Sequence, residues 1–201
     1  MAKIGPRWRV QFRRKREGKT DYRQRLKLLR SGKPRFVVRA SLKHITAMVV
    51  QAQTTGDLTI AAAHSKELRK LGWKGYTSNT PSAYLVGLLC GYRAIGAGVK
   101  ECVLDLGTHV PTPQSKVFAA LKGALDSGLQ IPHNEKILPS EKRIAGEHIA
   151  SYAKMLKEDD GKAYALRFSN YLKSGLMPED LPMHFNEVKQ AIVSRYGVKH
   201  A

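Results

Sequence analysis

The sequence predicts an α/β fold in which a mixed sheet, an antiparallel meander plus a parallel strand, is flanked by helices. A basic N-terminal arm and a helical C-terminal extension are expected at its two ends. Apolar and polar residues alternate through residues 36–63, which is typical of half-buried strands. Residues 80–128 show a helical, a strand and again a helical pattern, and the patterns after residue 139 are helical. This order of elements favours an α/β layer.

The first predicted helix follows a run of basic residues. Thr20 is expected to be its N-cap, Asp21 favours its first turn, and Gly32 ends it. An apolar stripe with the spacing i, i+4, i+7 is expected to dock this helix on the core; it consists of Tyr22, Leu26 and Leu29. The basic residues of the helix then point elsewhere.

Three successive strands are predicted next. Residues 36–40 place Phe36 and Val38 on one face and Val37 and Arg39 on the other. Residues 45–53 and 58–63 continue as strands, joined by a turn at residues 54–57. Strands joined by such short turns form an antiparallel meander.

A long helix opens at Thr80 as N-cap, with Pro81 in its first position. Gly87 and Gly91 lie within it and are expected to allow close packing against the sheet. Residues 102–106 form a short buried strand, residues 115–128 a second helix capped by Ser115, and residues 129–131 a short extended segment.

The C-terminal third predicts three amphipathic helices of modest length. An acidic linker at residues 158–161 is expected between the first two. Their apolar stripes are Ala145, Ile149, Tyr152, Ala153 and Leu156; Tyr164, Phe168, Tyr171 and Leu172; and Leu181, Phe185, Val188 and Ile192.

Charge is distributed unevenly along the chain. The 201 residues include 35 Lys and Arg against 16 Asp and Glu, a net charge of +19. Residues 1–43 alone hold 16 basic and two acidic residues. An ordinary domain mixes both signs over its surface, so this arm predicts a polyanionic partner.

The arm combines cations with aromatic residues. Four consecutive cations, residues 13–16, must stay solvated or meet phosphates from several directions. Trp8, Phe12 and Tyr22 lie among the cations and are suited to stacking on bases or riboses. RNA is the favoured partner. A solvated tail, a localisation signal and a polybasic membrane-surface patch are the alternatives.

Other classes of protein receive less support. Cys90 and Cys102 have no Cys-x-x-Cys spacing, so neither a disulfide scaffold nor a zinc site is expected, and no signal peptide or membrane span is predicted. The seven histidines show no metal-ligand spacing, and no cofactor motif is present. A metal-dependent nuclease would have to use Asp57 and Asp105, whereas Asp105 is expected to accept hydrogen bonds from loop N–H groups. No enzyme activity, catalytic residue, metal or cofactor is therefore expected.

Several motifs resemble the universal large-subunit ribosomal protein family that binds 5S rRNA, the eighteenth in the large-subunit naming series. They are RKREGKTDYRQRL at 14–26, LLRSGKPR at 28–35, PSAYL at 81–85, LDLG at 104–107, KVFAALKGA at 116–124 and IPH at 131–133. The resemblance extends from about residue 6 to about residue 195. The arm motif, the helical extension and the lack of long internal insertions are closest to the archaeal type within the archaeal and eukaryotic branch.

This resemblance implies a structural constituent of the large ribosomal subunit, located on cytoplasmic ribosomes, that binds 5S rRNA and helps attach it to the large-subunit rRNA. It implies protein neighbours that include another 5S rRNA-binding protein, and no membrane. The division expected is 1–34 for the basic RNA-binding arm and helix, 35–135 for the α/β core domain and 136–201 for the helical C-terminal extension.

The RNA contacts implied by the matching positions lie mostly in the arm. They are Arg7, Trp8, Arg9, Arg13, Arg14, Lys15, Arg16, Lys19, Tyr22, Arg23, Arg25, Lys27, Arg30, Lys33 and Arg35. Lys43 and His44 in a hairpin turn, and Lys116 at a helix N-terminus, are added to them. Two other classes remain open: an RNA-processing enzyme resembling ribonuclease H on the same sheet, and a membrane-surface protein that uses the arm.

Overall fold

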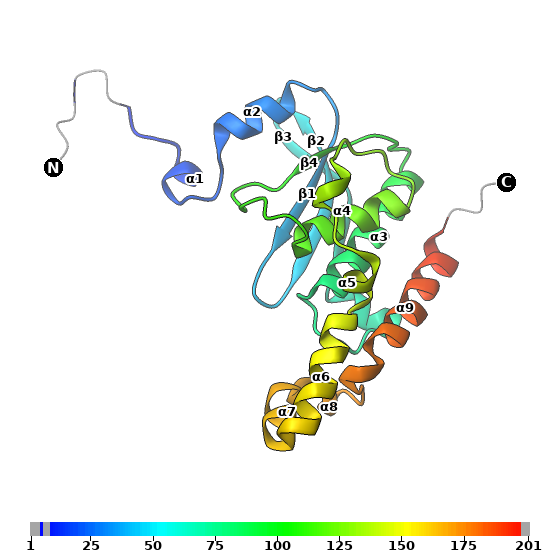
Figure 1. The fold of residues 1–201 in the computed structure, drawn as a ribbon. Coiled ribbons are helices and arrows are strands. Elements are labelled where there is room, and N and C mark those ends of the chain that lie inside the picture. The colour runs from blue at the N-terminus through cyan, green and yellow to red at the C-terminus, as the bar shows by residue number, and fades with distance from the viewer. Residues whose placement is uncertain (1–4, 6–8, 198–201) are drawn as a thin grey trace.

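The computed structural model describes residue 5 and residues 9–197 and confirms the α/β class. The strands of this part of the chain form one four-stranded mixed sheet in the order β3-β2-β1-β4 (Figure 1). β1 pairs antiparallel with β2 and parallel with β4, and β2 pairs antiparallel with β3. Their bounds are β1 Arg35–Ala40, β2 Ile45–Gln53, β3 Gly56–His64 and β4 Val103–Asp105.

The predicted meander is confirmed, with one difference at its second turn. β3 begins at Gly56, so that Asp57 lies on the strand opposite Ala52 instead of in the turn. These residues extend the pairing of β2 with β3. The added hydrogen bonds satisfy backbone N–H and C=O groups that would be left to solvent in a longer turn. The segment at 129–131 forms a single parallel bridge between Gln130 and Glu101.

Two helices cover one face of the sheet. They are α3, Thr80–Gly96, and α4, Lys116–Asp126. Phe36 and Val38 point into this layer and are completely buried, as their alternation predicts. The opposite face of β1 carries Arg35, Val37 and Arg39, and this face meets the N-terminal segment.

Helices α3 and α4 pack backbone against backbone. A Cβ atom on Gly87 would lie 1.9 Å from the carbonyl oxygen of Ala120, and one on Gly123 would lie 2.1 Å from that of Tyr84. A Cβ on Gly91 would lie 2.0 Å from Ser127 Oγ. The prediction of close packing at Gly87 and Gly91 is right, but the partner is helix α4 and not the sheet.

Ser115 is the N-cap residue of α4, as predicted, whereas the other two predicted N-caps are displaced by one residue. Asn79 caps α3, because its side-chain oxygen accepts a hydrogen bond of 3.0 Å from the backbone N–H of Ser82. Asp21 caps α2, Tyr22–Leu29, by accepting from the backbone N–H groups of Arg23 and Gln24. The Thr20 hydroxyl instead accepts a hydrogen bond of 2.9 Å from Arg14 Nε.

The N-terminal segment stands outside the layered core (Figure 1). It contains a single helical turn, α1 at Arg13–Arg16, followed by α2. The expected apolar docking of α2 is wrong in one respect: Leu26 is 55% exposed, whereas Arg25 turns toward the sheet. The ion pair between Arg25 and Asp57 takes over the docking role expected of Leu26.

The described C-terminal third contains five helices instead of the three predicted. Gly146, with φ of +90°, separates α5 from α6, and Phe168 separates α7, which ends at Arg167, from α8. The acidic linker is also wrong: α6 runs to Asp159, and Asp160 is the N-cap of α7. The helices are α5 Glu141–Ala145, α6 Glu147–Asp159, α7 Gly161–Arg167, α8 Ser169–Lys173 and α9 Leu181–Tyr196.

The C-terminal helices join the rest of the protein through α9. Its predicted stripe is confirmed, since Leu181, Phe185, Val188 and Ile192 are all buried and belong to the same apolar core as the sheet. The Phe185 ring lies 5.5 Å from that of Tyr84 on α3. Helices α6, α7 and α8 extend beyond this contact (Figure 1). Short 3-10 helices occur at Glu67–Leu71, Glu135–Ile137 and Pro178–Asp180.

We expect Gly87→Ala to lower the free energy of unfolding by about 2–3 kcal/mol, since the added methyl group forces α3 away from the α4 backbone. Gly96→Ala is the control, because a Cβ at this position meets no atom of the described chain within 4 Å. Ala is also the better helix former, so this variant is expected to be neutral or stabilised. Urea unfolding of both proteins measures the difference, and equal stabilities would contradict the helix contact.

Candidate nucleic-acid interface

The site is built on a buried arginine. Arg35 begins β1, and its side chain is 4% exposed on the face opposite the helices. Its Nη1 donates to Asp105 Oδ2 at 2.7 Å, and its Nη2 donates to Asp57 Oδ2 at 2.8 Å. Asp57 comes from β3 and Asp105 from the end of β4, so that one guanidinium links three strands.

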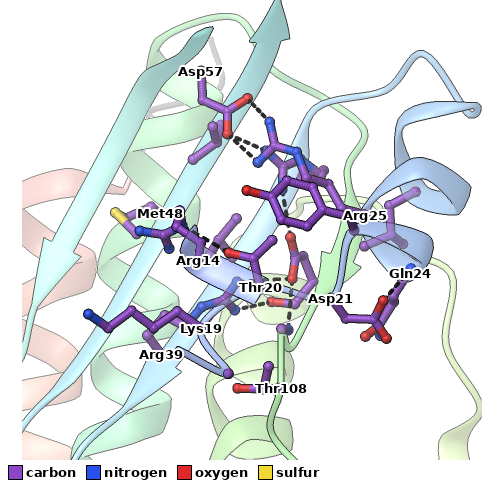
Figure 2. A pocket seen from close by; sticks show the side chains of 18 of the residues that line it. Arg14, Lys19, Thr20, Asp21, Gln24, Arg25, Arg39, Met48, Asp57 and Thr108 are labelled. Atoms are coloured by element: carbon purple, nitrogen blue, oxygen red, sulfur yellow. Dashed lines mark hydrogen bonds and ion pairs between the residues drawn. The ribbon is translucent and has the colours of Figure 1, made fainter. Parts of the chain in front are cut away.

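The two carboxylates bind further arginines. Asp57 receives a two-bonded contact from Arg25 of α2, at 2.9 and 2.8 Å, which fixes this helix over the sheet (Figure 2). Asp105 accepts a bond of 3.1 Å from Arg39 Nη2 and one of 2.8 Å from the backbone N–H of Gly107. The latter bond confirms the expectation that Asp105 serves a loop N–H group. We call Arg25, Asp57, Arg35, Asp105 and Arg39 the arginine–aspartate cluster.

The charges of the arginines keep both carboxyl groups ionised. Burial alone would raise the pKa of Asp105, but the charge of Arg39 and the hydrogen bonds from Arg39 and Arg35 outweigh it and hold the pKa below its usual value. For Asp57 burial is likewise outweighed, here by the hydrogen bond from Arg25 and the charge of Arg35. The cluster therefore keeps alternating full charges at neutral pH.

A groove of about 860 Å³ lies between the N-terminal segment and the sheet (Figure 2). Its lining contains the basic residues Arg14, Lys19, Arg25, Arg35 and Arg39 and the acidic residues Asp21, Asp57 and Asp105. Because the acids are occupied by the cluster and by the N-cap of α2, the cations of the arm determine the charge that the groove presents.

Five of the predicted contact residues line this groove, namely Arg14, Lys19, Tyr22, Arg25 and Arg35, and most of the others lie along the same N-terminal segment. The exposed ones are Arg9, Arg13, Arg14, Lys15, Arg16, Lys19, Arg23, Lys27, Arg30 and Lys33. Glu17 pairs with Lys19 at 2.8 Å and lies 3.8 Å from Arg13, and Lys33 pairs with Glu101. Tyr22 is half-buried, with its ring 5.1 Å from that of Phe12. Arg7 and Trp8 lie outside the described residues.

Other predicted residues lie elsewhere. Lys43 and His44 occupy the β1–β2 turn, as predicted, at the opposite end of β1 from α2. Lys116 begins α4, and its Nζ donates to the carbonyl oxygen of Ser41 at 3.2 Å and to Ser78 Oγ at 3.0 Å. Arg35 is the buried exception within the first group. These residues therefore do not form one continuous surface with the arm.

Arg39 is a groove residue that the sequence reasoning left out. It is 40% exposed and donates to Asp105 and to the carbonyl oxygens of Val38 and Asp105. The sequence does contain a signal for this residue. Arg35, Val37 and Arg39 are two residues apart in an alternating strand, so all three side chains lie on one face.

The arrangement of Asp57 and Asp105 differs from a metal site. The Arg35 guanidinium lies between the two carboxylates, so a cation there would have to displace an arginine. In the described part of the chain, no three metal-ligating side chains lie close enough together to hold an ion. Among the same residues, no helix has the length and apolar character needed to cross a membrane.

We expect Asp105→Asn to lower the free energy of unfolding at pH 7 by about 1–3 kcal/mol, because Arg35 keeps Asp57 but loses its second carboxylate. Carboxyl groups with lowered pKa contribute stability that is present above about pH 4 and is lost as the pH falls through their folded-state pKa. The variant should therefore lose less stability than the wild type between pH 5 and pH 2. Urea titrations measure this, with the exposed Glu17→Gln as the control.

A comparison with known protein families identifies the chain. The family model described as ribosomal large subunit proteins 60S L5 and 50S L18 matches residues 6–98 and 96–134, which is more than half of the chain and includes the arm from residue 6 onward, α2 and all four strands. This match confirms the resemblance seen in the sequence motifs. Its members are structural ribosomal proteins and not enzymes. The chain belongs to this family of large-subunit ribosomal proteins, which bind 5S rRNA.

Proposed function

We propose that the basic arm and α2 form the surface that binds 5S rRNA and that the protein helps attach this RNA to the large-subunit rRNA. One observation carries the proposal: the cations of α1, and Arg23 and Lys27 of α2, are exposed, while α2 is held by Arg25 on Asp57. Cations on a fixed helix meet phosphates with less loss of conformational freedom than cations on a free tail.

The cations and the arginine–aspartate cluster divide the work. The exposed arm cations named above, together with Arg7, neutralise phosphates, and the aromatic rings of Trp8 and Tyr22 stack on bases or riboses. Arg25 and Arg35 are positioning residues, because their guanidinium groups are already bonded to carboxylates. Lys43, His44 and Lys116 contact RNA at a separate place.

The partners follow from the same assignment. They are 5S rRNA, the large-subunit rRNA and neighbouring ribosomal proteins, including another 5S rRNA-binding protein. We assign residues 1–34 to the RNA-binding arm and helix, 35–135 to the α/β core and 136–201 to the C-terminal extension. Within the family, the motif at residues 14–26 supports the archaeal type.

Deletion of residues 1–19 is expected to abolish tight 5S rRNA binding and to leave the fold intact. Residues 9–19 are all exposed, and their ion pairs lie at the surface, where such pairs contribute little. We expect at least a 100-fold loss of affinity at physiological salt, about 2.7 kcal/mol. A filter-binding titration and a thermal melt measure the two properties. Binding within threefold of the full chain would assign 5S rRNA to the α/β body instead.

The salt dependence of binding tests whether phosphates are the main contacts. With roughly 6 to 8 phosphates neutralised, log K is expected to fall against log salt with a slope of about −4 to −7. Lys15→Ala should reduce this slope by about 0.7–0.9, whereas Lys154→Ala, an exposed cation on α6, should leave it unchanged. A wild-type slope near −1 would argue against the arm as a phosphate-binding segment.

A further inference from the structure

A second basic groove lies at the far end of the sheet from α2. It has a volume of about 750 Å³ and is bounded by the β1–β2 turn, the loop after the first 3-10 helix, and α8. Its cations are Lys43, Arg69, Lys74 and Lys173. The six residues of β1 separate the turn in this groove from Arg35, at the start of the strand, by about 20 Å.

The charge of this groove is not balanced within the described chain. None of the residues lining it is acidic, and its four cations form no ion pair with any described residue. The neighbouring acid, Glu67, is occupied: it accepts from Arg93 Nη2 at 2.8 Å and from the backbone N–H of His64 at 2.9 Å. Four unpaired cations around one groove attract a polyanion.

The positive charges near the groove affect the pKa of its histidine, His44. Burial lowers the pKa of His44, and the charges of His64, Lys66, Arg69 and Lys43 lower it further. The His44 ring lies 4.9 Å from the His64 ring.

The walls of the groove are held in place by hydrogen bonds. The Tyr76 hydroxyl donates to the carbonyl oxygen of Leu42 at 2.6 Å, and the Thr77 hydroxyl donates to that of Lys43 at 2.6 Å. On the other side, the Ser174 hydroxyl donates to the carbonyl oxygen of Lys74 at 3.0 Å. These bonds join the turn, the loop and α8. The backbone segments that carry the cations are therefore fixed relative to one another before a ligand binds.

An aromatic surface completes the groove. Tyr76 lies in its lining and is 43% exposed although its hydroxyl is bonded. An aromatic ring among cations suits RNA, because a base stacks on the ring while the phosphates on either side meet the cations. An acidic protein segment would use the cations but would have no base to place on the ring.

We propose that this groove binds a second segment of RNA, distinct from the 5S rRNA held by the arm. The inference rests on the proposed function, in which the arm binds 5S rRNA. The groove is then where the protein binds the second RNA segment: Tyr76 stacks on a base, and the phosphates are bound by Lys43, Arg69, Lys74 and Lys173. Recognition of this kind tolerates sequence variation, since each base has a face that stacks.

The test uses the full chain already saturated with 5S rRNA. A fluorescent single-stranded oligoadenylate of ten nucleotides is titrated into this complex, and its anisotropy is followed. We expect Arg69→Glu/Lys74→Glu to weaken oligonucleotide binding at least tenfold while 5S rRNA affinity stays within threefold of wild type. Because both residues are exposed, we expect the variant to keep the wild-type melting temperature, and this measurement verifies that it is folded. The matched control, Lys142→Glu/Lys154→Glu, carries the same charge change on exposed residues of α5 and α6 and should bind both RNAs normally.

A second pair of variants tests the stacking surface. Tyr76→Ala is expected to weaken oligonucleotide binding at least fivefold without changing its salt slope, because stacking depends little on salt. Tyr76→Phe keeps the ring but loses the bond to Leu42, and should bind within threefold of wild type. Equal losses in both variants would mean that Tyr76 only holds the turn and would overturn its stacking role.

Four results would overturn the proposal for the groove. They are a wild-type complex that does not bind the oligonucleotide, a groove variant that binds it normally, a groove variant that loses 5S rRNA instead, and displacement of the oligonucleotide by an equal concentration of a polyglutamate peptide. Failure of the proposed function is read separately, as retention of 5S rRNA binding by the chain lacking residues 1–19.

Discussion

The buried charge of Arg35 is the constraint on which the interface depends. A guanidinium that is 4% exposed requires carboxylate partners, because removing it from water without them costs several kcal/mol. Asp57 on β3 and Asp105 at the end of β4 meet this requirement. Asp57 also accepts hydrogen bonds from Arg25, and Asp105 also accepts one from Arg39. The need to neutralise one strand residue thus determines where α2 lies.

This mode of attachment keeps α2 polar. A helix docked by an apolar stripe would have to bury that stripe, but every residue of α2 is half-buried or exposed. Because the Arg25 contact carries the attachment, the other cations of α2 remain free of the fold and available to phosphates. The same feature makes the attachment depend on ionised carboxylates, whereas the core behind the sheet depends on apolar packing of α3, α4 and α9.

The alternation of apolar residues was sufficient to predict β1, β2, β3 and their order, because one face of each strand packs on a continuous core. The errors occur where a pairwise contact decides. The Thr20 hydroxyl accepts a hydrogen bond from Arg14, and Asp21 caps the helix instead. Leu26 is exposed because Arg25 binds Asp57, which is 32 residues away in sequence. Gly87 was recognised as a packing residue, but its partner Ala120 depends on tertiary structure.

The two basic surfaces stand in a fixed geometric relation. Arg35, the central residue of the arginine–aspartate cluster, begins β1, and the turn that carries Lys43 and His44 follows the end of this strand. A strand paired on both sides and packed on α4 does not bend easily, so the distance between the two ends of β1 is set by the sheet. β1 thus sets a spacing of about 20 Å between its start, where Arg35 and Arg25 share Asp57, and the turn that carries Lys43. Under our proposal that both surfaces bind RNA, the stability of the core becomes a functional property, because it fixes the spacing between them.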